Sequence, residues 1–106
     1  MYYLKNKEQL NSLISELRQN IDREYKFSPK PQKFRELVAH CMGFKSDAAL
    51  VANLVDPDFH FYLEEDVNEN FHQKLCSALN SQPYGCNTNI EKIKYFYDEA
   101  VDKHSS

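Results

Sequence analysis

The sequence predicts a mainly α protein with a small β element (α+β), in which about five helices surround one core beside a short strand or two-stranded edge. Apolar residues recur at three- and four-residue steps along most of the chain. The period shifts to two residues over 59–63. Capping residues and helix breakers separate these segments. The 106 residues have the length of one domain, which we place at 1–106.

Two helices are expected before residue 43. The first spans about residues 6–24, with Asn6 as its N-cap and Gln9 at the capping-box position, and it stops before the two prolines of segment 28–31. The second runs from 31 to about 42, and Gly43 ends it in the left-handed conformation. The predicted buried stripes comprise Leu10, Leu13, Ile14, Leu17 and Ile21 in the first helix and Phe34, Leu37, Val38, Cys41 and Met42 in the second.

Three further helices are expected after Gly43. Ser46 caps a short helix over 46–54, Asn68 caps one over 68–80, and Asn89 caps one over 89–103. Their predicted inward residues are Ala49, Leu50 and Leu54, then Phe71, Leu75, Cys76 and Leu79, and finally Ile90, Ile93, Tyr97, Ala100 and either Phe96 or Val101.

The alternation over 59–63 is typical of a half-buried strand. Phe59, Phe61 and Leu63 share one face of it, and His60 and Tyr62 lie on the other. A lone strand cannot satisfy its backbone groups. Its expected partner is residues 1–4 or the same strand of a second copy.

The charges are unevenly distributed along the chain. The formal net charge is −3, which argues against a protein held to nucleic acid by positive charge alone. Residues 1–45 carry nine Lys/Arg and five Asp/Glu, whereas residues 46–106 carry four and eleven. The two parts can pair within the chain or with a second copy.

The cysteine count and the hydropathy indicate a cytoplasmic protein without a membrane partner. Three cysteines with no CxxC spacing disfavour a disulfide framework. The most apolar window, residues 48–55, is too short to span a membrane, and the N-terminus lacks the apolar core of a signal peptide. Cys41 and Cys76 fall on apolar stripes, whereas Cys86 lies in a polar loop and is the thiol expected to react most readily.

Two groups of residues have side chains that could take part in catalysis or bind a metal ion. Asp58, His60, Tyr62 and Glu64 would project from one face of the strand, as a row able to perform acid–base chemistry or hold a cation. The same row is typical of a solvated strand face. His72 and Cys76 are four residues apart on a predicted helix, with Cys86 in the next loop, but no fourth donor completes a zinc site. We therefore predict no catalytic residue, cofactor or metal.

A basic region surrounds the two prolines. Its cations are Lys26, Lys30, Lys33 and Arg35, and they alternate with Tyr25, Phe27 and Phe34, a mixture that can bind nucleic acid. The helix–glycine–helix arrangement of 37–54 is similar to a helix-turn-helix. Its second helix lacks Lys and Arg, which disfavours DNA binding.

Residues 34–50 resemble a helical module of small bacterial proteins. The shared pattern is E-L-[VI]-A-x-x-x-G-[FY]-x-[SD]-x-x-x-L, and some of its carriers are glyoxalase-related while others are products of mobile elements or integron gene cassettes. The chain differs from the glyoxalase-related pattern at Ala48, where an aromatic residue is usual, and it lacks the βαβββ run of the glyoxalase metal site. The resemblance implies a bacterial, cytoplasmic accessory-gene product and assigns no catalytic residue.

These observations favour a non-enzymatic binding or interaction module that forms a homodimer or binds another protein. Seven Tyr and seven Phe exceed what one small core needs, and exposed tyrosine is enriched at interfaces. One alternative is a small-ligand binder or enzyme that uses the Asp58–Glu64 row, and another is nucleic-acid binding through Lys26–Arg35. The candidate interface consists of Tyr2, Phe59, His60, Phe61 and Tyr62.

Overall fold

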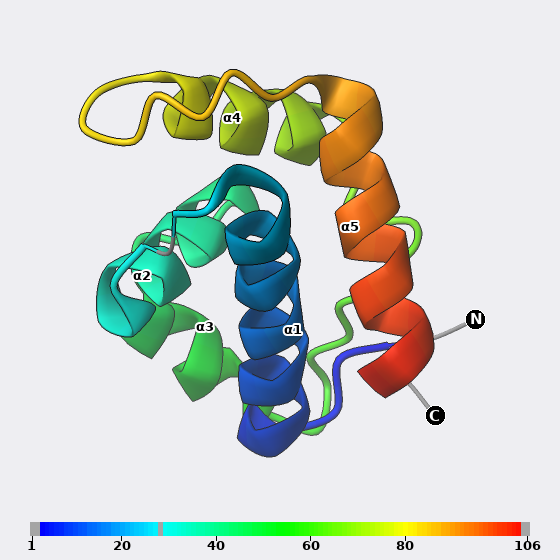
Figure 1. Ribbon diagram of the computed structural model, residues 1–106. Coiled ribbons are helices and arrows are strands. Elements are labelled where there is room, and N and C mark those ends of the chain that lie inside the picture. Colours follow the sequence, from blue (N-terminus) through cyan, green and yellow to red (C-terminus); the bar gives the residue numbers. More distant parts are fainter. Residues whose placement is uncertain (1–2, 28, 105–106) are drawn as a thin grey trace.

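Five helices account for most of the described chain, so the mainly α prediction is confirmed. The computed structural model describes residues 3–27 and 29–104. In Figure 1, α1 stands between α5 and α2, and α4 crosses above it to contact both of these neighbours, while α3 packs on α2. The helices are α1 (Lys7–Tyr25), α2 (Pro31–Cys41), α3 (Asp47–Leu54), α4 (Glu69–Asn80) and α5 (Ile90–His104).

The predicted N-cap residues cap four of the helices. Each cap side chain accepts a hydrogen bond from a backbone N–H of the first turn, which satisfies one of the donors that a helix start leaves free. Gln9 reaches back as predicted, although its Oε1 accepts from the N–H of Lys5 (2.7 Å) and not from that of the cap residue. The cap bonds run from Gln9 N to Asn6 Oδ1 (2.8 Å), from Ala49 N to Ser46 Oγ (3.0 Å), from Asn70 N to Asn68 Oδ1 (3.0 Å) and from Lys92 N to Asn89 Oδ1 (2.9 Å).

Gly43 ends α2 in the way that the sequence predicts. Its φ is +100°, a region that favours glycine. The N–H of Gly43 donates to His40 O and the N–H of Phe44 donates to Ala39 O, both at 3.0 Å. These two bonds form the Schellman pattern, which satisfies carbonyls at the helix end and directs Phe44 back toward the core.

One hydrophobic cluster contains buried residues from all five helices. Most predicted stripe residues belong to it, and both Phe96 and Val101 are buried. Five of the predicted inward residues are only half-buried and lie at the margin of the core: Leu37, Ala49, Leu54, Cys76 and Ile90. His72, which is not among the predicted stripe residues, is buried as well.

The predicted β element is not formed in the described residues, which contain no strand. A single antiparallel bridge joins Tyr3 to Tyr62, and the N–H of Leu4 donates to Phe61 O (2.8 Å). The chain turns directly afterwards, because Asp66 binds both backbone groups of Tyr62: its Oδ2 accepts from the N–H (2.6 Å) and its N–H donates to the carbonyl (2.9 Å). The turn that begins at Tyr62 bends the chain out of the extended conformation, so pairing stops at this one bridge, which is the physical reason for the correction.

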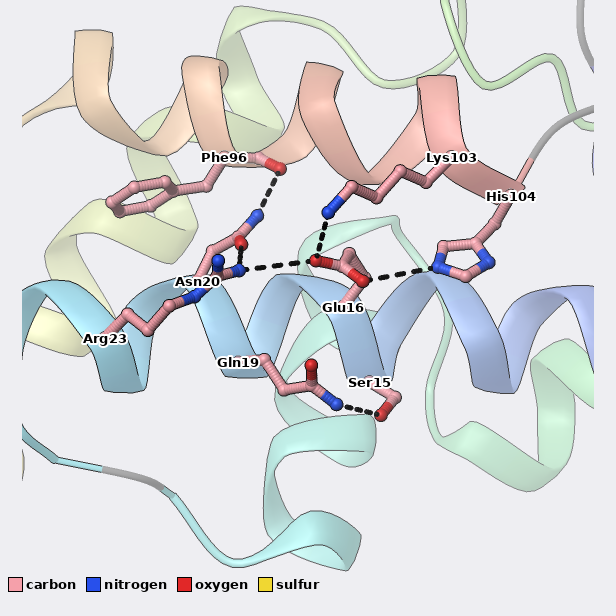
Figure 2. A network of polar contacts seen from close by, with 8 residues as sticks. All are labelled: Ser15, Glu16, Gln19, Asn20, Arg23, Phe96, Lys103 and His104. Atoms are coloured by element: carbon pink, nitrogen blue, oxygen red, sulfur yellow. Dashed lines mark hydrogen bonds and ion pairs between the residues drawn. The ribbon is translucent and has the colours of Figure 1, made fainter.

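A polar network fastens α5 to α1, as Figure 2 shows. The Glu16 carboxylate is 13% exposed and faces Lys103 Nζ (3.2 Å), Arg23 Nη2 (3.4 Å) and His104 Nε2 (3.5 Å). Burial raises the pKa of Glu16, but the hydrogen bonds from Lys103 and His104 outweigh it and hold the pKa below 4.5. Beside this group, Asn20 Nδ2 donates to the Phe96 carbonyl (3.3 Å).

Candidate functional site

The two sides of segment 59–63 have different surroundings. Phe61 and Leu63 are buried, and Phe59 is half-buried. The Phe59 and Phe61 rings lie 6.0 and 5.7 Å from Phe44, which the Schellman turn directs toward them. Phe59 and Phe61, two residues of the candidate interface, therefore pack against the protein itself.

The outer side carries three aromatic rings in mutual contact, which we name the aromatic patch: Tyr3, His60 and Tyr62. Tyr3 meets His60 edge to face at 6.0 Å and Tyr62 at 6.3 Å, and the rings of His60 and Tyr62 stack at 6.3 Å. Lys5 Nζ lies 6.0 Å from the Tyr3 ring centroid. Tyr3 is 40% exposed, His60 is exposed and Tyr62 is half-buried. Tyr2, also predicted for the interface, lies outside the described residues.

The predicted polar row does not stay together. Asp58 lies in the preceding turn, where its N–H donates to Asp56 Oδ1 (2.9 Å). His60 and Tyr62 belong to the aromatic patch, whereas Glu64 follows the turn and lines a cavity beside α5. The structure thus places the four residues in three settings: a turn, the aromatic patch and a cavity wall.

Two of the three thiols, Cys41 and Cys86, are buried, which disfavours the reactive thiolate. Cys86 was expected to be the most reactive, but it is buried, and burial raises its pKa. Burial also raises the pKa of Cys41, to about 11. Cys76 Sγ lies 3.7 Å from the Thr88 carbonyl oxygen. Asn80 Nδ2 donates a hydrogen bond to the same oxygen (2.9 Å). Across residues 3–27 and 29–104, no group of three or more His, Cys, Asp or Glu side chains is placed to hold a metal ion.

The aromatic rings in the basic region around the two prolines pack against the rest of the protein. Phe34 is buried, Phe27 packs edge to face on Tyr84 (5.6 Å), and the Tyr25 hydroxyl donates to Thr88 Oγ1 (2.5 Å). These rings are therefore engaged in packing and not presented for stacking on bases.

A cavity that the sequence did not reveal lies between the turn after segment 59–63, the first half of α4 and the middle of α5. Its volume is about 600 Å³. His72 forms part of its wall, and so does Tyr97, whose hydroxyl donates to the Leu63 carbonyl (2.9 Å). Burial raises the pKa of Tyr97, so this hydroxyl stays protonated and remains a donor. The remaining lining residues are Glu64, Val67, Asn68, Glu69, Ile90, Lys94 and Asp98.

No helix of the described residues combines the length and the apolarity required to cross a membrane. Comparison with known proteins found no match to the chain among protein-family models, curated proteins or solved structures.

Proposed function

We propose that the chain is a non-enzymatic interaction module that forms a homodimer through the aromatic patch. The observation that supports this proposal is the mutual contact of Tyr3, His60 and Tyr62 on an outward face. Rings already held against one another lose little conformational freedom on association, and tyrosine combines a large apolar area with a polar tip that tolerates water. A twofold contact would place the same patch on both copies, as an isologous interface requires.

The charges beside the patch suit such a twofold contact. Lys5 precedes it, and the exposed residues Glu65 and Asp66 follow it. A twofold axis at the patch can bring the lysine of one copy opposite the acidic turn of the other, which makes the charge arrangement self-complementary. The backbone contributes less than a continuous ladder would, because Asp66 already binds both backbone groups of Tyr62.

Light scattering after size exclusion tests the proposal. At about 50 μM the protein should have twice the 12.5-kDa mass of the chain, and the dimer should weaken as salt screens the flanking charges. Tyr62→Ser should raise the dimer dissociation constant at least about tenfold, because a central tyrosine that acts as an interface hot spot contributes about 2 kcal/mol or more.

Tyr95→Ser is the matched control. Tyr95 is 64% exposed on α5 and lies outside the patch, so its loss removes a similar aromatic side chain without touching the proposed interface. Its dissociation constant should equal that of the unsubstituted chain. A 12.5-kDa monomer at 50 μM, or equal weakening by both substitutions, would overturn the proposal.

A further inference from the structure

We propose that the cavity between α4, α5 and the 63–69 segment binds a small organic cation, an ammonium group carrying a hydrocarbon portion. This site is separate from the aromatic patch, and the inference does not depend on the proposed dimer. The cavity of about 600 Å³ falls within the range of sites that hold small molecules. The ligand class follows from three features of the wall.

The first feature is charge. Glu64, Glu69 and Asp98 line the cavity, and Lys94 is the one basic side chain among its lining residues. A second hollow shares Glu64 and Asp98 with the cavity and adds Asp102. Fixed negative charge around a concave surface concentrates cations there and repels carboxylates and phosphates.

The second feature is His72, a wall residue with a buried ring nitrogen that lacks a hydrogen-bond partner among the described residues. It is 7% exposed, it lines the cavity, and its Nε2 has no hydrogen-bond partner in the described structure. Burial lowers the pKa of His72 and the nearby Lys94 lowers it further, whereas Asp98 and Glu69 partly oppose this effect. At neutral pH the ring is therefore uncharged and keeps a lone pair that can accept a hydrogen bond from an ammonium N–H.

The Nε2 atom of His72 lies buried behind the cavity wall, so the proposal includes a turn of the ring when the ligand binds. The torsion that turns a histidine ring about its Cβ–Cγ bond is soft. A modest rotation would bring a ring nitrogen to the cavity side of the wall, where a bound ammonium would satisfy it. An unsatisfied buried polar atom costs free energy, so a ligand that supplies the missing bond gains from that contact.

The third feature is the apolar part of the wall. Leu63, Val67 and Ile90 line the same space, and the adjoining hollow adds Val101. A hydrocarbon chain can cover these side chains while its charged end lies at the acidic rim. A bare metal ion would leave this surface without a partner, which favours an organic cation.

Protein NMR with three matched probes tests the proposal. Hexylammonium, hexan-1-ol and hexanoate have the same chain length and differ in charge. Titration of the ¹⁵N-labelled chain at pH 7.5 should give hexylammonium shifts concentrated in segments 63–72 and 90–102, with a dissociation constant on the order of millimolar for so small a fragment. Hexan-1-ol should bind several-fold more weakly, and hexanoate should give no saturable shifts.

Charge substitutions provide a second arm. Asp98→Asn should weaken hexylammonium binding roughly two- to fivefold, and Lys94→Gln should strengthen it by a similar factor, as expected for single charges near the surface. Asp58→Asn removes the same charge in a turn that does not line the cavity, and it should leave the affinity unchanged.

Substitution of His72 tests the hydrogen bond. His72→Phe retains a ring that can pack against Phe71 and Tyr97, which the native imidazole meets at 5.6 and 6.0 Å, but it has no nitrogen. A helical circular dichroism spectrum equal to that of the parent, with at least threefold weaker hexylammonium binding, supports the proposal. Equal binding of the three probes, shifts outside the cavity segments, or unchanged affinity in both Asp98→Asn and His72→Phe would overturn it.

Discussion

Replacing Gly43 with alanine tests the backbone geometry that ends α2. Gly43 has a φ of +100°, where L side chains are disfavoured. A Cβ added at this position meets no atom within 4 Å outside its immediate chain neighbours. The substitution therefore creates no clash with the rest of the fold, and its cost is conformational alone.

The magnitude follows from the two responses open to the chain. If φ at position 43 stays positive, a residue with a Cβ lowers stability by about 1–2 kcal/mol, because L side chains are strained in the left-handed region. If φ relaxes, the Schellman bonds from Gly43 to His40 and from Phe44 to Ala39 are lost, each contributing about 1 kcal/mol. Either response lowers the free energy of unfolding by about 1–2 kcal/mol, which corresponds to a fall in Tm of about 4–8 °C per kcal/mol.

Urea denaturation followed by circular dichroism measures this cost. Gly43→Val should be more destabilising than Gly43→Ala, because a β-branched side chain is strained further at positive φ. Gly85 provides the comparison: its φ is +58° and an added Cβ also finds open space, so Gly85→Asn should change stability by less than about 0.5 kcal/mol. An unfolding free energy of Gly43→Ala within about 0.5 kcal/mol of the parent would refute the reasoning.

Three further substitutions test the core and its ionisable groups. Leu75→Ala should cost about 2–5 kcal/mol in urea denaturation because Leu75 is fully buried in α4, whereas the half-buried Leu37 should cost only about 1–2 kcal/mol when replaced by alanine; equal losses would contradict the assigned burial. Glu16→Gln should cost about 0.5–1.5 kcal/mol at pH 7. Because the hydrogen bonds from α5 hold the pKa of Glu16 below 4.5, the parent should lose this advantage as pH falls from about 4.5 through the folded-state pKa, and a difference that persists at pH 2 would contradict the prediction. Burial lowers the pKa of His72 below 6.5, so the unfolded chain binds more protons just below pH 6.5 and stability should fall there by at most about 1.4 kcal/mol per pH unit. In His72→Phe this pH slope should be smaller, and an unchanged slope in denaturation curves between pH 6.5 and 5 would contradict the assignment.

The helices could be predicted because their signals are local. Asn6, Ser46, Asn68 and Asn89 each cap the helix that the sequence assigned to them, and Gly43 adopts the positive φ that its position requires. A cap and a three- to four-residue stripe depend on neighbours within one or two turns. These features can therefore be predicted without knowledge of the tertiary structure.

The small β element illustrates where local signals fail. The alternation over 59–63 predicted correctly that Phe61 and Leu63 are buried and that His60 is exposed. Alternation specifies the two faces of an extended segment but not a partner for its backbone. That second condition depended on Asp66, whose bonds to Tyr62 end the pairing after one bridge.

The cavity beside α5 was not predicted because no sequence spacing unites its lining. In the sequence, His72 stood out only for its four-residue spacing from Cys76, an incomplete set of metal donors from which we predicted no metal site. In the fold its ring meets Tyr97, 25 residues further along the chain, and shares a cavity with the turn that follows Leu63. Long-range packing of this kind depends on how α4 and α5 meet, which a periodicity within either helix does not specify.

The charge segregation of the sequence has a structural consequence that favours association. Residues 1–45 have an excess of bases and residues 46–106 an excess of acids, and ion pairs within the chain could join one excess to the other. Two of the ion pairs between the parts run the other way: Glu24 meets Lys92, and Glu16 meets Lys103. Arg35 with Asp47, at 3.9 Å, matches a majority base with a majority acid. Minority charges thus form two of the ion pairs between the parts, while most bases of residues 1–45 and most acids of residues 46–106 are exposed. A second copy in a twofold dimer can supply the counterpart, and the salt dependence of the dimer measures how far it does so.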